Sequence, residues 1–252
     1  MATTGAIIQA RMTSTRLPGK VLKTVLGRPL LEYQLERLRR ATGINRIIVA
    51  TTTNVEDDQI VDFCAQQRVP VFRGLEQDVL DRYYQTALRF SIDPIVRITG
   101  DCPLIDPQIV DRLVTTFQNG AYDFVHSGPT FAEGLDCEIF TLAALERAWK
   151  EAIKPSEREH ATLYLHRHSE FFRKHTLDNG SDDSRFRITV DEPEDFEVVK
   201  IIIEALYPRH PEFTGEDVLQ YLSAHPEMMA TNSHIVRNEG LLKSLSAEKG
   251  SS

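Results

Sequence analysis

A basic segment near the start of the chain has residue types that can hold a polyphosphate. Residues 9–20 read Gln-Ala-Arg-Met-Thr-Ser-Thr-Arg-Leu-Pro-Gly-Lys and follow an apolar run at 6–10 that predicts a buried strand. Arg11 and Arg16 can each donate two parallel hydrogen bonds to phosphate oxygens, and Lys20 adds a compact charge. Backbone N–H groups of small residues can bind the remaining oxygens. The segment is neither a Walker loop nor a G-x-G-x-x-G loop, and a solvated basic loop is the alternative interpretation.

Two aspartates follow strand-like runs elsewhere in the chain. Asp101 follows the predicted strand at 95–99 after one glycine, and Asp191 follows 185–190, where apolar and polar residues alternate strictly, as in a half-buried strand. Carboxylates at strand ends are good ligands for Mg²⁺, which binds a few carboxylates together with phosphate oxygens and water. If the two strands are neighbours, both carboxylates can reach one cation. For Asp101 the alternative is a turn aspartate that caps the local backbone.

Alternating strands and helices must position these groups. The predicted strands are 6–10, 46–51, 70–73, 95–99, 123–126, 135–140 and 185–190. Helices are predicted around 31–38, 57–67, 79–90, 107–117 and 142–149, after Ser156, from Pro193 to 206, and near 216–223 and 234–245. This order predicts an α/β fold, a three-layer αβα sandwich with a mainly parallel sheet. In such sheets ligands bind beyond the carboxyl ends of the strands, where the basic segment and both aspartates stand.

Composition limits the class of protein. The 252 residues, 41% hydrophobic and 26% charged, predict one globular domain over 1–252, less regular around 120–180. The net charge of -8 argues against broad nucleic-acid binding. Three widely spaced cysteines form no disulfide or zinc framework and suit a reducing cytoplasm. With no signal peptide and no apolar run long enough to span a bilayer, we expect a cytoplasmic protein without a membrane partner.

Segment 9–20 resembles the A-R-x-x-S-x-R-L-P-G-K signature of the cytidylyltransferases that activate sialic-acid-like nonulosonates and ketodeoxyoctonate. It resembles most their relatives in spore-coat polysaccharide biosynthesis. The resemblance extends in order over about 6–207: Gly100–Leu104 matches G-D-x-P-L, and 186–196 is similar to R-x-T-V-D-E-P-E-D-F. It implies a nucleotide-diphospho-sugar transferase-like fold, CTP as donor, an acidic sugar as acceptor, Mg²⁺ as cofactor and a homodimer.

The same resemblance implies roles for individual residues. Arg11, Arg16 and Lys20 would hold the triphosphate, and Asp101 and Asp191 would bind the metal ion. The catalytic residues would be Lys20, Arg11 and Asp101. The nucleotide-binding residues would be Gln9, Ala10, Arg11, Ser14, Arg16, Lys20, Arg73 and Thr99.

The middle of the chain also matches the family pattern, at Glu133–Glu138 and Arg158–His160. The resemblance implies that residues around 120–180 form a dimer contact and help to bind the acceptor. The acceptor-binding residues would be Glu133, Asp136, Glu138, Arg158 and His160. Arg158 and His160 could receive a carboxylate or phosphate, and a charged, solvated helix start is the alternative.

Other polar residues have simpler interpretations. Asp78 is expected to cap a helix and to pair with Arg82 across one turn. Ser156 with Glu159 predicts a capping box. Arg97 lies either on a polar face or in the cleft. Asn238-Glu239-Gly240 resembles the spore-coat branch without an assigned role.

Four functions are compatible with this sequence. The first is transfer of CMP from CTP to a nonulosonate or ketodeoxyoctonate-like acid, with release of pyrophosphate, for a surface polysaccharide. The second is nucleotidyl transfer to another small acceptor, such as a phosphorylated sugar or polyol. The third is a glycosyltransferase on the same fold, which is disfavoured because the middle of the sequence lacks a D-x-D motif. The fourth is a non-catalytic nucleotide-binding module, which the presence of both aspartates and all three cations disfavours.

Overall fold

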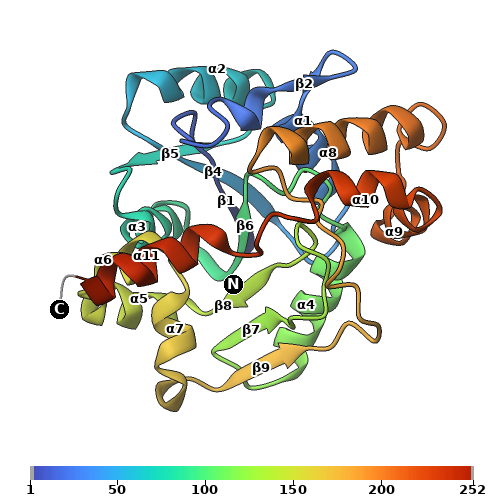
Figure 1. Ribbon diagram of the computed structural model, residues 1–252. Coiled ribbons are helices and arrows are strands. Elements are labelled where there is room, and N and C mark those ends of the chain that lie inside the picture. The colour runs from blue at the N-terminus through green and yellow to red at the C-terminus, as the bar shows by residue number, and fades with distance from the viewer. Residues whose placement is uncertain (1–2, 251–252) are drawn as a thin grey trace.

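A seven-stranded sheet forms the centre of the computed structural model, which describes residues 3–250 (Figure 1). Its strands are β1 (Thr3–Gln9), β4 (Arg46–Thr52), β5 (Val71–Gly74), β6 (Ile92–Thr99), β7 (Phe124–Ser127), β8 (Glu138–Phe140) and β9 (Lys174–Leu177). The order across the sheet is β5-β4-β1-β6-β8-β7-β9. Only β8 runs antiparallel to its neighbours, β6 and β7. The other pairs are parallel, as the alternation of strands and helices predicts.

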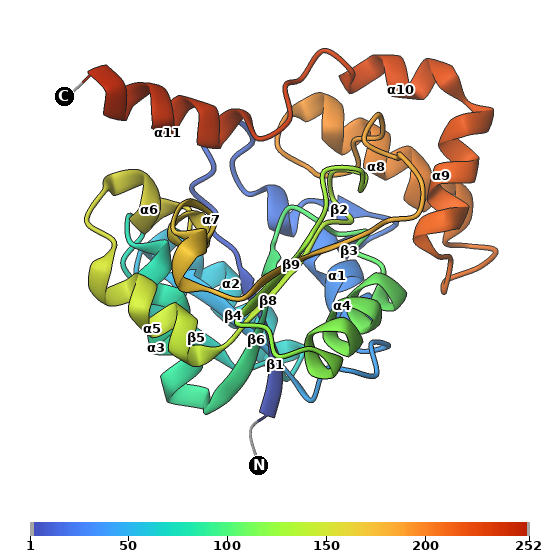
Figure 2. The same cartoon turned by 90° about the horizontal axis from the view of Figure 1, so that it is seen from below.

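Helices cover both faces of the sheet. One face packs against α1 (Leu30–Leu38), α2 (Asp58–Gln66) and α4 (Pro107–Asn119). The other packs against α3 (Val79–Phe90), α5 (Leu142–Glu151) and α7 (Leu163–Arg167). Figure 2 shows the layers with α3 and α5 on one side and α1 and α4 on the other. The centre of β1 is apolar because Ala6 and Ile8 face the first layer while Ile7 faces the second, as expected for a strand buried on both sides. The predicted αβα sandwich is confirmed.

A third apolar cluster lies beside the sandwich. It joins α8 (Pro193–Leu206) and α9 (Gly215–Ala224) to the small hairpin of β2 (Thr24–Val25) and β3 (Arg28–Pro29). The chain ends in α10 (Pro226–Asn232) and α11 (Glu239–Gly250). The remaining short elements are α6 (Pro155–Glu159), η1 (Lys20–Leu22), η2 (Val55–Asp57) and η3 (Ser169–Phe171). None of the helices within residues 3–250 is long and apolar enough to cross a membrane.

The predicted strand at 185–190 is wrong. This segment joins no strand of the sheet and makes a single bridge, between Glu133 and Arg187. The alternation is misleading because the polar side is buried too: Arg187 is 8% exposed and Thr189 4%. Arg187 tolerates burial because its guanidinium pairs with Asp195 at 2.8 Å and with Glu133 at 2.5 Å, as a buried charge requires.

Two local predictions also need correction. Ser156 is not a cap, because α6 already begins at Pro155 and Ser156 is buried within it. Asp78 does cap α3, accepting from the Asp81 N–H at 2.9 Å. Arg82 does not pair with it, since the Arg82 guanidinium donates to the backbone oxygens of Leu75 and Glu76. The ionic partner of Asp78 is Arg158.

Candidate active site

A cavity of about 780 Å³ opens where β1 and β6 end, within the size range of small-molecule sites. The two strand ends are neighbours because Gln9 pairs with Thr99 in the parallel register. Gly100 continues this contact, donating from its N–H to the Gln9 oxygen at 2.8 Å. A side chain at Gly100 would place Cβ 2.9 Å from that oxygen. The close approach of these two ends therefore requires glycine at position 100.

Most of the residues predicted to bind ligands surround this cavity. Those that line it are Gln9, Ala10, Arg11, Ser14, Arg16, Lys20, Thr99, Asp101, Arg158, His160 and Asp191. The basic segment reaches the cavity as a folded loop, since the Met12 N–H donates to the buried Asp57 carboxylate at 2.7 Å. Gly19 ends the loop with φ of 69°, a conformation that glycine adopts readily. Lys20 then begins the short helix η1.

Lys20 connects the two aspartates. Its Nζ lies 2.7 Å from Asp191 Oδ1 and 3.2 Å from Asp101 Oδ2, and its side chain is 11% exposed. Burial by itself would lower the pKa of Lys20, but the charges of Asp101 and Asp191 outweigh it and raise the pKa. The ammonium group is therefore fully charged at neutral pH, and two carboxylates from distant parts of the chain share one cation.

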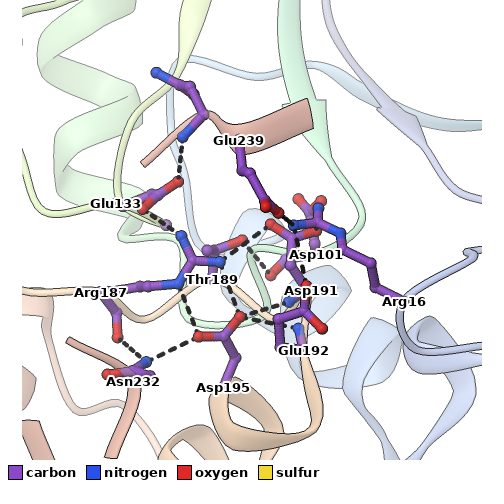
Figure 3. Close-up of polar contacts among 12 residues, drawn as sticks. Arg16, Asp101, Glu133, Arg187, Thr189, Asp191, Glu192, Asp195, Asn232 and Glu239 are labelled. Carbon is purple, nitrogen blue, oxygen red and sulfur yellow. Dashed lines mark hydrogen bonds and ion pairs between the residues drawn. The ribbon is translucent and has the colours of Figure 1, made fainter. Parts of the chain in front are cut away.

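The two aspartates meet through the backbone around them. The Val190 N–H donates to the Asp101 backbone oxygen at 2.8 Å, and the Thr189 hydroxyl donates to the same atom at 3.2 Å. Arg187 supports Asp191 from the other side at 3.3 Å (Figure 3). The carboxylates thus converge even though Asp191 does not end a strand of the sheet.

Asp101 is held in its charged form. Burial raises its pKa, but the charge of Lys20 and hydrogen bonds from Thr99, Lys20 and Cys102 outweigh burial, so the net pKa is lowered. An ionised carboxylate is the form that binds a metal ion or a lysine.

Both arginines of the basic loop are paired with acids. Arg11 Nη1 lies 2.8 Å from Glu76 Oε1. Arg16 contacts Asp191 at 2.8 Å, Glu239 at 3.2 Å and Glu192 at 3.4 Å, and Figure 3 shows its guanidinium between these carboxylates. The contacts keep the guanidinium groups ordered at the cavity. A bound polyanion would replace these carboxylates as the partner of each arginine.

Four of the predicted residues do not line the cavity. Arg73 donates to the backbone oxygens of Thr52 and Asn54 and pairs with Asp58. Glu133 is the partner of Arg187, Asp136 accepts from the Gly134 N–H, and Glu138 pairs with Arg97 and His166. The sequence leaves Arg97 either on a polar face or in the cleft. Arg97 pairs with Glu138 of the neighbouring strand β8 and does not line the cavity. These side chains brace the elements behind the cavity.

The sequence assigns no role to several residues at the cavity and behind it. Glu76 holds Arg11, and Arg187 with Asp195 supports Asp191. Gly240, Lys243 and Ser244 of α11 line the cavity as well. Residues 238–240, which resemble the spore-coat branch, lie at the start of this helix. Nothing in the sequence indicates that the helix folds back over the site.

Comparison with known proteins shows the family of the chain. The model of the family described as cytidylyltransferase matches residues 5–213. The chain belongs to the cytidylyltransferase family. This cytidylyltransferase is 39% identical over 234 residues to a protein of Methanocaldococcus jannaschii, covering 91% of this chain and 94% of that protein. It is 31% identical over 229 residues to the spore coat polysaccharide biosynthesis protein SpsF of Bacillus subtilis, covering 88% and 94%. The family predicted from the motifs is thus confirmed.

Solved structures share the fold of this cytidylyltransferase. A cytidylyltransferase of Leptospira borgpetersenii superposes with a TM-score of 0.88 at 36% identity, covering 94% of this chain and 100% of that one. A CMP:2-keto-3-deoxy-manno-octonic acid synthetase solved with CTP superposes with a TM-score of 0.61 at 17% identity, covering 80% and 99%. The second similarity concerns the fold alone.

Proposed function

We propose that this cytidylyltransferase transfers CMP from CTP to a sugar acid of the nonulosonate or ketodeoxyoctonate type, releases pyrophosphate, and depends on Mg²⁺. The observation that carries the proposal is the convergence of Lys20, Asp101 and Asp191 at a cavity whose wall includes Arg11 and Arg16. A role in surface polysaccharide synthesis is supported by the similarity to SpsF.

The donor set fits a hard divalent cation. Asp101 and Asp191 each place a carboxylate oxygen within 3.2 Å of the same nitrogen of Lys20, so the two acids already share a positive charge. Mg²⁺ prefers carboxylate and phosphate oxygens, and Asp101 and Asp191 are the residues that would hold it. When bound, such an ion neutralises charge on phosphate oxygens.

The side chains of the basic loop would bind the rest of the nucleotide. Arg11 and Arg16 would exchange their carboxylate partners for phosphate oxygens, and Lys20 would add its charge beside them. An acceptor oxygen would attack the α-phosphorus, the bond from that phosphorus to the bridging oxygen of the β-phosphate would break, and the acceptor proton would pass to solvent. The residues lower the barrier by aligning the groups and stabilising the charge on departing pyrophosphate.

The remaining expectations are part of the same proposal. We place the enzyme in the cytoplasm, which suits its three buried, unpaired thiols. We take 1–252 as one nucleotidyltransferase domain in which an insertion around 120–180 forms a homodimer contact and helps to bind the acceptor. Ile153, 88% exposed, and Phe171, 44% exposed, are apolar side chains of this region. Sedimentation equilibrium tests the dimer, and a monomer at micromolar concentration would refute it.

Pyrophosphate release tests the reaction. Each of the four nucleoside triphosphates would be incubated with Mg²⁺ and a panel of ketodeoxyoctonate, nonulosonic acids, and phosphorylated sugars and polyols. We expect release with CTP and one sugar acid. Release with CTP and a phosphorylated acceptor would retain cytidylyl transfer and replace the acceptor class. Release with UTP or dTTP and a sugar phosphate would overturn the proposal.

A further inference from the structure

Helix α11 covers one side of the cavity. Its residues Gly240, Lys243 and Ser244 belong to the cavity lining. Figure 2 shows α11 outside the layers of the sandwich, above α6 and α7. The family match ends at residue 213, so this wall of the site lies beyond the matched region.

Polar contacts hold α11 in place. Glu239 pairs with Arg16 at 3.2 Å. The Ser244 hydroxyl donates to Glu159 at 2.8 Å and lies 3.1 Å from His160 Nε2. None of residues 239–249 is fully buried. The end of α11 is anchored as well, since Glu248 pairs with Arg167 at 3.2 Å. All of these contacts are polar and the helix has no fully buried residue, so the start of α11 can shift at low free-energy cost when the cavity fills.

The cations near α11 differ in what they already bind. Arg158 uses Nε and Nη2 on Asp78 and Nη1 on the Trp149 oxygen. Arg82 is 2% exposed and donates to backbone oxygens of Leu75 and Glu76. His160 contacts Ser244, and burial lowers the pKa of its imidazole, so the ring is not the cation of this wall at neutral pH.

Lys243 differs from these cations because its ion-pair partner can be exchanged for a ligand. Its side chain is 66% exposed, and its ionic contact is with Glu239 one turn away on the same helix, at 2.9 Å. Exchanging this partner for a ligand costs little, since exposed ion pairs of this kind contribute little to stability. Glu239 is also the partner of Arg16, so Lys243 and Arg16 of the basic loop share one carboxylate.

We propose that Lys243 on α11 binds the acidic group of the acceptor and selects anionic acceptors. The proposal rests on the function proposed above. When the triphosphate takes Arg16, Glu239 loses that partner and α11 is free to adjust. Lys243 then pairs with the acidic group of the acceptor, and α11 moves toward the bound acceptor.

Matched variants test this role in the full chain. Wild type, Lys243→Ala, Lys243→Arg and the control Lys249→Ala would be assayed by pyrophosphate release with CTP, Mg²⁺ and the sugar acid that the wild type uses. Lys249 lies on the same exposed helix outside the cavity lining. Lys243→Ala should raise KM for the acid about tenfold or more, because a hydrogen bond to a charged group is lost. KM for CTP should be unchanged, Lys243→Arg should recover the acid KM, and Lys249→Ala should match wild type. An unchanged acid KM in Lys243→Ala, or an equal rise in the CTP KM, overturns the proposal.

If the wild type releases no pyrophosphate with any acid of the panel, that result counts against the proposed reaction itself. A second measurement then tests the binding role of Lys243 without turnover. Amide hydrogen exchange of residues 239–249 would be followed with CTP and then with ketodeoxyoctonate or each nonulosonic acid. We expect one of these acids to slow exchange in wild type and Lys249→Ala but not in Lys243→Ala. Absence of slowing with every acid, or equal slowing in Lys243→Ala, overturns the assignment.

Discussion

Lys20 and Asp191 are 171 positions apart in the sequence, yet the ammonium nitrogen of one lies 2.7 Å from a carboxylate oxygen of the other. The contact closes the site, because it joins the basic loop after β1 to the segment that precedes α8. Asp101 shares the same ammonium group at 3.2 Å. One lysine therefore links the three parts of the protein that supply the cation and both carboxylates.

Replacing Lys20 tests the importance of this charge. Lys20→Met should lower kcat for pyrophosphate release by about 100-fold or more, since removing one group that stabilises developing charge typically costs that much. It should also weaken CTP binding, measured by calorimetry. Lys200→Met is the matched control, because Lys200 is a half-buried residue of α8 that pairs with Glu197 away from the cavity. Near-normal kcat in Lys20→Met would contradict the role of the ammonium group.

Asp101→Asn tests the carboxylate with little change of shape. We expect loss of turnover by about 100-fold or more while part of the CTP affinity survives, because Arg11 and Arg16 are untouched. Steady-state kinetics and calorimetry measure the two effects separately. Asp62→Asn, on the exposed side of α2, is the control and should behave as wild type. Turnover in Asp101→Asn close to that of Asp62→Asn would refute the assignment of this carboxylate.

Arg158 and Asp78 should act as a pair. Arg158 Nε donates to Asp78 Oδ2 at 3.1 Å, while Asp78 Oδ1 caps α3. Because both ends of the contact are needed to hold α6 against α3, the effects of Arg158→Ala and Asp78→Asn on the free energy of unfolding should not add. A coupling energy of about 0.5–3 kcal/mol is expected. Urea unfolding of both single variants and the double variant measures it, and strictly additive effects would show that the contact contributes nothing.

Glu138 should make stability depend on pH in the acid range. Burial raises its pKa, but the charge of Arg97 and the contacts of His166 and Thr162 outweigh burial and lower the pKa well below its usual value. A group with a lowered folded-state pKa stabilises the protein above its unfolded pKa, about 4.3, and that stability is lost as pH falls below this value.

Glu138→Gln should therefore lower the free energy of unfolding at pH 7 and reduce its decline between about pH 5 and pH 3. Urea unfolding across that range provides the measurement. The exposed Glu197→Gln on α8 should keep the wild-type slope. If the free energy of unfolding of Glu138→Gln falls with decreasing pH as steeply as that of the wild type, Arg97 does not hold this carboxylate in its charged form.

The first half of the sheet could be predicted from the sequence. The strands expected at 6–10, 46–51, 70–73 and 95–99 correspond to β1, β4, β5 and β6. These strands lie next to one another, and β1 and β4 are buried on both faces along the unbroken apolar runs 6–8 and 47–50, which makes them easy to predict. The basic loop and Asp101 follow directly from such strands, which is why their position at the cavity could be anticipated.

Other features depend on contacts that a local pattern does not encode. Arg187 alternates with apolar neighbours as an exposed strand residue would, but Glu133 and Asp195 make its burial possible. Glu138 belongs to a motif that matches the family, yet its side chain turns to Arg97. The return of α11 over the cavity rests on long-range contacts such as that of Glu239 with Arg16, 223 positions earlier. Each case needs tertiary information to fix the direction of a side chain.

Isotope transfer tests the central claim most directly. The wild-type protein would be incubated with Mg²⁺ and the acceptor panel, once with CTP labelled at the α-phosphate and once with CTP labelled at the γ-phosphate, beside Asp101→Asn as a blank. Cytidylyl transfer predicts that the α-label appears in a CMP–sugar acid product and the γ-label in pyrophosphate, with both signals lost in Asp101→Asn. Appearance of the γ-label in the acceptor, or equal product with the variant, would contradict the account.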